Sequence, residues 1–125
     1  MAHILIIEDD PAVRSLLAEM LTRRGHTVQQ AENGQDGIHA FRTRPSELVI
    51  TDLIMPQKEG LETIIDLRSE FPDLKIIAIS GGSRGSRDNY LRTAALCGAA
   101  RIFRKPFDNE ELLAAVEELL TVDPA

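Results

Sequence analysis

Polar residues that could do chemistry stand at the ends of several apolar runs in this 125-residue chain. The acidic triplet "EDD", residues 8–10, follows "HILII", and Asp52 follows "LVIT". Ser80 ends the run "KIIAIS", and Lys105 follows "RIFR". A carboxylate at the end of a buried strand is costly to desolvate unless something pairs with it. We therefore expect Asp52 to have close partners.

Brought together, these side chains would suit phosphoryl transfer. Clustered carboxylates repel, by about 1 kcal/mol for two unit charges about 4 Å apart in bulk water. Either Lys105 or a bound Mg²⁺ could offset this repulsion, and Mg²⁺ typically takes one or two carboxylates and keeps water and phosphate as its other ligands. Aspartate is a nucleophile toward phosphorus, and a metal ion and a lysine would neutralise charge on the transferred group.

Apolar strands alternate with amphipathic helices along the whole chain. Strands are expected over residues 3–7, 27–31, 48–52, 75–80 and 101–103, and helices over 11–24, around 38–41, over 60–71 and 88–96, and from about 108. This alternation predicts an α/β fold, a doubly wound five-stranded parallel sheet with five helices on its two faces. Sites in such sheets form outside the carboxyl ends of the strands, which is where the polar residues stand.

Composition limits the class of protein. The net charge of -6, from 20 acidic and 14 basic residues, argues against direct binding of nucleic acid. No apolar run reaches the roughly 20 residues of a membrane helix, and "MAHILIIEDD" lacks the features of a signal peptide. We expect a cytoplasmic protein with residues 1–125 as a single domain and no output domain visible in the sequence.

Several other reactive residue types have simpler interpretations. Cys97 is the only cysteine, which excludes an intramolecular disulfide, and its place in the apolar stretch "AALCGAA" favours a buried structural thiol. The three histidines, His3, His26 and His39, have no metal-ligand spacing and are expected to be structural or exposed. Asp10 directly precedes Pro11, which favours a role as the N-cap of the first helix.

Four motifs in order resemble those of the response-regulator receiver domain, and the likeness covers essentially the whole chain. The motifs are "ILIIEDDPAVR", "LVITDLIMPQKEG", "IIAIS" and "FRKPF". The resemblance implies a flavodoxin-like fold with strand order 2-1-3-4-5. It also implies a phosphoacceptor in a two-component or phosphorelay system, for which the word enzyme holds only loosely because the chain catalyses its own phosphorylation and dephosphorylation.

Carried over by position, Asp52 is the phosphoacceptor. Glu8, Asp9, Asp52 and the main-chain carbonyl of Ile54 would hold Mg²⁺, with Asp9 the more direct ligand of the acidic pair. Ser80 and Lys105 would contact phosphoryl oxygens, and the peptide bond between Lys105 and the following proline would be cis.

The resemblance also implies partners. The donor would be a histidine kinase or a histidine phosphotransfer protein. A downstream protein partner or output domain would be reached through the surface of the fourth helix, fifth strand and fifth helix, which also allows a homodimer. No direct contact with nucleic acid or a membrane is expected.

Three features depart from the family pattern. Ile102 stands where an aromatic residue is common, "GGSRGSRDN" after Ser80 is about three residues longer than usual, and Ile54 is apolar where polar residues are common. A non-phosphorylated interaction module therefore stays an alternative. An aspartyl phosphatase would need an acid in place of Ile54, and a flavodoxin-like nucleotide site would meet repulsion from the acidic loop unless metal is bound.

Overall fold

Five parallel strands form one sheet in a computed structural model that describes residues 2–53, 60–80 and 98–121. The sheet order is β2-β1-β3-β4-β5, which confirms the doubly wound, flavodoxin-like prediction. The strands are β1 (His3–Ile7), β2 (Thr27–Ala31), β3 (Leu48–Asp52), β4 (Lys75–Ser80) and β5 (Arg101–Arg104).

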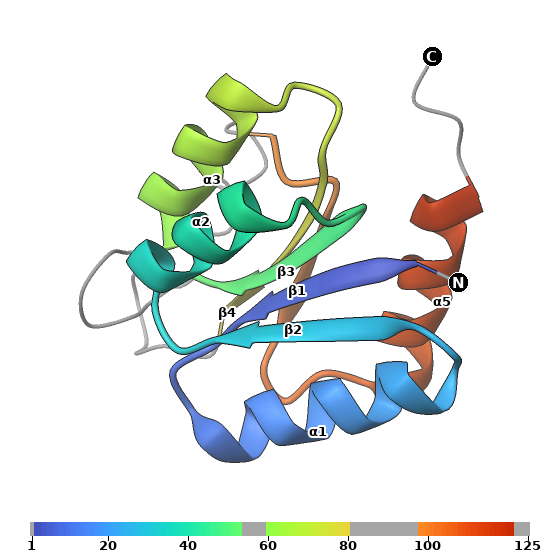
Figure 1. Ribbon diagram of the computed structural model, residues 1–125. Helices are drawn as coiled ribbons and strands as arrows, with labels where there is room; N and C mark the ends of the chain where they lie inside the picture. The colour runs from blue at the N-terminus through green and yellow to red at the C-terminus, as the bar shows by residue number, and fades with distance from the viewer. Residues whose placement is uncertain (1, 54–59, 81–97, 122–125) are drawn as a thin grey trace.

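Helices cover both faces of the sheet (Figure 1). They are α1 (Pro11–Arg23), α2 (Gly34–Thr43), α3 (Gly60–Glu70) and α5 (Asn109–Thr121). Helices α1 and α5 pack on one face, and α2 and α3 pack on the other. The helix predicted over residues 88–96 lies outside the described residues, as does Cys97. In the part of the chain that the structure describes, no helix has the length and apolar character needed to cross a membrane.

Local signals mark the helix ends, and the predicted N-cap at Asp10 is confirmed. Asp10 is the N-cap of α1, and its Oδ1 accepts a hydrogen bond from the N–H of Ala12 at 2.9 Å. Gly25, just beyond α1, has a φ of 91°, a conformation that glycine adopts without steric cost. Asp108 Oδ1 accepts a hydrogen bond from the N–H of Glu111 at 3.0 Å and so caps α5.

Strand β1 is apolar from Ile4 to Ile7 because both of its faces are covered. Ile4 and Ile6 pack in the core between the sheet and helices α1 and α5, whereas Leu5 and Ile7 pack in the core under α2 and α3. All four side chains are 0% exposed. Strand β1, which pairs with β2 and β3, therefore contributes to the cores on both faces, and these contacts hold its carboxyl end in place.

The same alternation of side chains shows whether Phe103 of β5 could replace the aromatic residue that the family often has at the position of Ile102. Ile102 packs against the core under α2 and α3, and Phe103 packs against the core on the opposite face. Successive strand residues point to opposite faces of a sheet. Phe103 therefore does not occupy the position that the aromatic residue would have on the Ile102 side.

Candidate functional site

The carboxyl ends of neighbouring strands bring the predicted residues to one edge of the sheet. Glu8 directly follows β1, and Asp52 ends β3 beside Ile79 of β4, whose last residue is Ser80. The main-chain N–H of Lys105 donates to the carbonyl oxygen of Ser80 at 2.8 Å. This bond holds the segment after β5 at the same edge, and the peptide bond that follows Lys105 is cis, as predicted.

Three carboxylates lie together at this edge. Glu8, Asp9 and Asp52 each offer an oxygen within 4.8 Å of the other two. Glu8 is 1% exposed and Asp52 is 5% exposed, whereas Asp9 is exposed. Such a cluster of hard oxygen donors, open to water on one side, fits Mg²⁺. The predicted fourth ligand, Ile54, lies outside the described residues.

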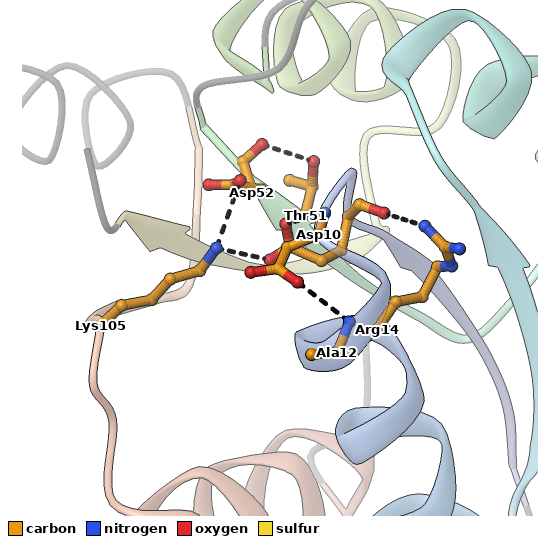
Figure 2. Close-up of polar contacts among 7 residues, drawn as sticks. Asp10, Ala12, Arg14, Thr51, Asp52 and Lys105 are labelled. Carbon is orange, nitrogen blue, oxygen red and sulfur yellow. Dashed lines mark hydrogen bonds and ion pairs between the residues drawn. The ribbon is translucent and has the colours of Figure 1, made fainter.

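Lys105 faces the carboxylates directly. Its Nζ lies 2.7 Å from Glu8 Oε1 and 3.4 Å from Asp52 Oδ2 (Figure 2). Partial burial acts to lower the pKa of Lys105, but the two carboxylates outweigh burial and raise it above its ordinary value. The ammonium group therefore keeps its charge and offsets part of the repulsion within the cluster.

Glu8 is the most deeply buried of the carboxylates. Burial raises the pKa of Glu8 to about 7, and the negative charge of Asp52 acts in the same direction. Lys105 and the main-chain N–H of Asp10, which donates to Glu8 Oε2 at 3.1 Å, oppose this shift. Near neutral pH the Glu8 carboxyl is therefore divided between its protonated and ionised forms.

Ser80 carries a hydroxyl group without a hydrogen-bond partner among the described residues. Its side chain is 0% exposed, and its Oγ is buried. Leaving a buried hydroxyl unsatisfied typically costs about 1–3 kcal/mol. A donor kept in this condition at the end of β4 is available to a group that binds at the same edge.

Arg14 is a residue whose contact the sequence analysis missed. It lies in the first turns of α1, and its Nη1 donates to the main-chain carbonyl of Glu8 at 2.8 Å (Figure 2). Glu8 is the first residue beyond β1, so its carbonyl needs a partner outside the strand. The sequence signal for this contact is an arginine six positions after Glu8, in the first turns of the next helix, from where its side chain can reach the Glu8 carbonyl.

Comparison with known proteins identifies the fold family. Residues 4–117 match the family model described as "Response regulator receiver domain". The chain belongs to this family. The receiver is 36% identical over 122 residues to the DNA-binding transcriptional regulator NtrC of Azospirillum brasilense, and the match covers 95% of this chain and 24% of that protein. The receiver thus spans about a quarter of the length of this relative.

Solved receiver structures share the whole fold. The receiver domain of NtrX from Brucella abortus superposes with a TM-score of 0.88 at 26% identity, covering 96% of this chain and 99% of that one. The response regulator protein TrrA from Thermotoga maritima, in complex with Mg(2+)-BeF, gives a TM-score of 0.83 at 33% identity, covering 95% and 99%. The prediction of a receiver domain is confirmed.

Proposed function

We propose that this receiver takes a phosphoryl group on Asp52 from a phosphohistidine of a histidine kinase or histidine phosphotransfer protein. The observation that carries the proposal is the meeting of Asp52 with two further carboxylates and Lys105 at one sheet edge. A carboxylate oxygen of Asp52 attacks the phosphorus, a P–O bond forms, and the P–N bond to the donor imidazole breaks. The products are an aspartyl phosphate and a free histidine side chain.

The proposed Mg²⁺ ligands are Glu8, Asp9, Asp52 and the main-chain carbonyl of Ile54. When bound, the ion neutralises negative charge on the phosphoryl oxygens. The TrrA complex with Mg(2+)-BeF, a relative with 33% identity, supports a site of this kind. The buried hydroxyl of Ser80 donates to one phosphoryl oxygen, and Lys105 pairs with another.

The output of this step is proposed to be a change in the surface formed by the fourth helix, β5 and α5, because added charge at the site biases a two-state equilibrium. That surface serves a downstream protein or an output domain, and it also allows a homodimer. NtrC is named as a DNA-binding regulator, but this receiver matches only 24% of it. We propose that a receiver of this kind controls such an output from the cytoplasm without touching DNA itself.

Intact-protein mass after incubation with acetyl phosphate tests the proposal. The receiver and an Asp52→Asn variant are compared with and without Mg²⁺. One phosphoryl adduct that requires Mg²⁺ and is absent from Asp52→Asn is the expected result. An adduct that persists in the variant would place the phosphoacceptor elsewhere.

A non-phosphorylated interaction module is the second candidate, and Ile102 favours it. Its aliphatic side chain packs against the core where the family often has a mobile aromatic ring. A receiver that binds neither Mg²⁺ nor a phosphoryl group, even with a phosphorylated histidine phosphotransfer protein as donor, would support this candidate.

A further inference from the structure

We propose that Arg14 is a positioning residue of the acidic cluster. Its hydrogen bond to the Glu8 carbonyl holds the turn between β1 and α1 so that Glu8 and Asp9 present their carboxylates toward Asp52. The inference rests on the proposed function, because it concerns binding of Mg²⁺ at that site.

The main chain of Glu8 is held on both sides as it leaves the sheet. Its N–H donates to the carbonyl of Ala31 in β2 at 3.0 Å. Its carbonyl accepts from Arg14 Nη1 at 2.8 Å. The first contact continues the pairing of β1 with β2, whereas the second comes from a helix side chain. Arg14 therefore sets the direction in which the chain turns toward Asp9.

The side chain of Glu8 depends on the same turn. Glu8 Oε2 accepts from the main-chain N–H of Asp10 at 3.1 Å, and Glu8 Oε1 faces Lys105. The N–H of Arg14 in turn donates to the carbonyl of Asp10 at 2.9 Å. Arg14 thus contacts the turn at its first and third residues, once through its side chain and once through its main chain.

The charge of Arg14 is not used in an ion pair with a described carboxylate. Glu32 and Asp36 line the same surface hollow as Arg14, yet no ion pair between them and Arg14 occurs within 4.0 Å in the described parts of the chain. Arg14 is half-buried, and the hydrogen bond of its guanidinium group goes to the main chain of the turn. A hydrogen bond to a main-chain carbonyl, in place of an ion pair, is what we expect of a side chain that fixes the backbone of the turn.

Arg14 and Lys105 act differently at the cluster. Lys105 contacts carboxylates that an ion or a phosphoryl group would also contact, so it has to adjust when either one binds. Arg14 approaches from α1 and donates to a main-chain oxygen (Figure 2). It can keep this bond while the carboxylates bind a ligand.

The test compares Arg14→Met and Arg14→Lys with the matched control Arg23→Met. Arg23 is on the same helix, but it is exposed and pairs with Glu19 instead of the turn. Mg²⁺ affinity is measured by isothermal titration calorimetry, and amide hydrogen exchange at Asp10 is measured by NMR in the metal-free protein. Urea unfolding shows that each titrated sample is folded.

We expect Arg14→Met to weaken Mg²⁺ binding about tenfold, as typically follows the loss of an outer-shell partner of a metal ligand. Exchange at Asp10 should become faster in the same variant. Arg14→Lys should recover part of the affinity, and Arg23→Met should leave it unchanged. Loss of a positive charge alone would strengthen cation binding. The sign of the change therefore separates positioning from charge.

Equal Mg²⁺ affinity in Arg14→Met and wild type would overturn the inference, even if Arg14→Met is less stable, because Arg14 would then serve only the fold. If Arg14→Met does not fold, Arg14→Lys decides by the same comparison of affinity and exchange. A wild-type receiver that binds no Mg²⁺ would overturn the proposed function and this inference with it.

Discussion

The ammonium group of Lys105 lies closer to the buried Glu8 carboxylate, at 2.7 Å, than to the proposed phosphoacceptor Asp52, at 3.4 Å. Glu8 thus keeps the lysine at the sheet edge, within a short side-chain movement of a group bound to Asp52. The ion pair between Lys105 and Glu8 also lets each charge compensate the other, because burying either charge without a partner would be costly in free energy. Lys105 is thus a partner of the carboxylates in this structure, and in the proposed reaction it also pairs with a phosphoryl oxygen.

Replacing Lys105 by Met should separate metal binding from phosphoryl transfer. Met keeps the length of the side chain and removes its charge, so a positive charge no longer opposes Mg²⁺, whereas the phosphoryl oxygens lose a partner. Lys105 also lowers the pKa of Glu8, so its loss favours the protonated carboxyl. Mg²⁺ affinities are therefore compared at the high-pH plateau of each protein, where we expect Lys105→Met to bind Mg²⁺ as tightly as wild type or more tightly. Phosphorylation by acetyl phosphate at saturating Mg²⁺ should be at least about tenfold slower.

Lys75→Met is the matched control for this change. Lys75 begins β4, at the end of the strand opposite Ser80, and its Nζ donates to the carbonyl of Leu119 at 2.6 Å. The control loses the same charge far from the site and should keep the wild-type rate. Equal rates for Lys105→Met and wild type would show that the lysine serves only to compensate Glu8.

Mg²⁺ affinity should rise with pH through about 7. Because burial raises the pKa of Glu8 to about 7, most Glu8 carboxyls hold a proton below this pH, and Mg²⁺ has to displace it. We expect the affinity to fall by up to about tenfold for each pH unit below 7 and to level off above about 8. Calorimetry at several pH values, in buffers of different ionisation enthalpy, measures both the affinity and the protons released.

Glu8→Gln is the control for the pH dependence. Gln keeps a neutral oxygen ligand and cannot titrate, so its Mg²⁺ affinity should be weaker and nearly flat over the same range. A wild-type profile as flat as that of Glu8→Gln would show that Glu8 is already ionised at pH 6 or does not approach the ion.

Asp9 and Asp10 are adjacent acids with different expected roles. Asp10 caps α1 by accepting from the N–H of Ala12, so Asp10→Ala should lower the free energy of unfolding by about 1 kcal/mol. Its Mg²⁺ affinity should stay within about threefold of wild type, because the bond to Glu8 Oε2 comes from the main chain of Asp10.

Asp9→Asn should do the reverse. It removes an exposed carboxylate from the cluster, so Mg²⁺ binding should be lost while metal-free stability is kept or raised by relief of repulsion. Urea unfolding without metal and calorimetry with Mg²⁺ are run on both variants. Loss of Mg²⁺ binding in Asp10→Ala with retention in Asp9→Asn would exchange the two roles.

The positions of β1, β3 and β4 were predictable because each is an apolar run bounded by polar residues. The prediction for β5, residues 101–103, ends one residue before the observed Arg104. That Glu8, Asp52, Ser80 and Lys105 meet at one edge follows from parallel strands whose carboxyl ends align. The order of the strands came from the family resemblance, since periodicity does not say which strands are neighbours.

Contacts within the site were less predictable. Spacing along the chain does not reveal that Lys105 lies closer to Glu8 than to Asp52, since both distances depend on how the segment after β5 turns. The bond from Arg14 to the Glu8 carbonyl depends on the direction of the chain between β1 and α1. By contrast, strand alternation alone could have placed Ile102 and Phe103 on opposite faces of the sheet.

Helix α2 packs closely on β1 where Gly37 meets Ile7, the residue just before Glu8, and substitutions at these two positions test how much this packing contributes to stability. A Cβ at Gly37 would lie 2.4 Å from Ile7 Cδ1 and 2.7 Å from Ile7 Cγ1, and Ile7 is fully buried. Gly37→Ala should therefore lower the free energy of unfolding by about 1–3 kcal/mol through overpacking, although alanine favours helix more than glycine does. Ile7→Val removes Cδ1 and should cost about 0.5–1.5 kcal/mol by itself.

The double variant with Gly37→Ala and Ile7→Val should be more stable than the sum of the two single losses predicts, because valine removes the Cδ1 contact with the new methyl group and leaves only the contact with Cγ1 to be relieved. Urea unfolding of the four proteins gives the coupling energy directly. Strict additivity would mean that α2 moves away from β1 as a unit instead of meeting Ile7. Helix movement of that kind would also disturb the end of β1, and a changed Mg²⁺ affinity of Gly37→Ala would then detect it at Glu8.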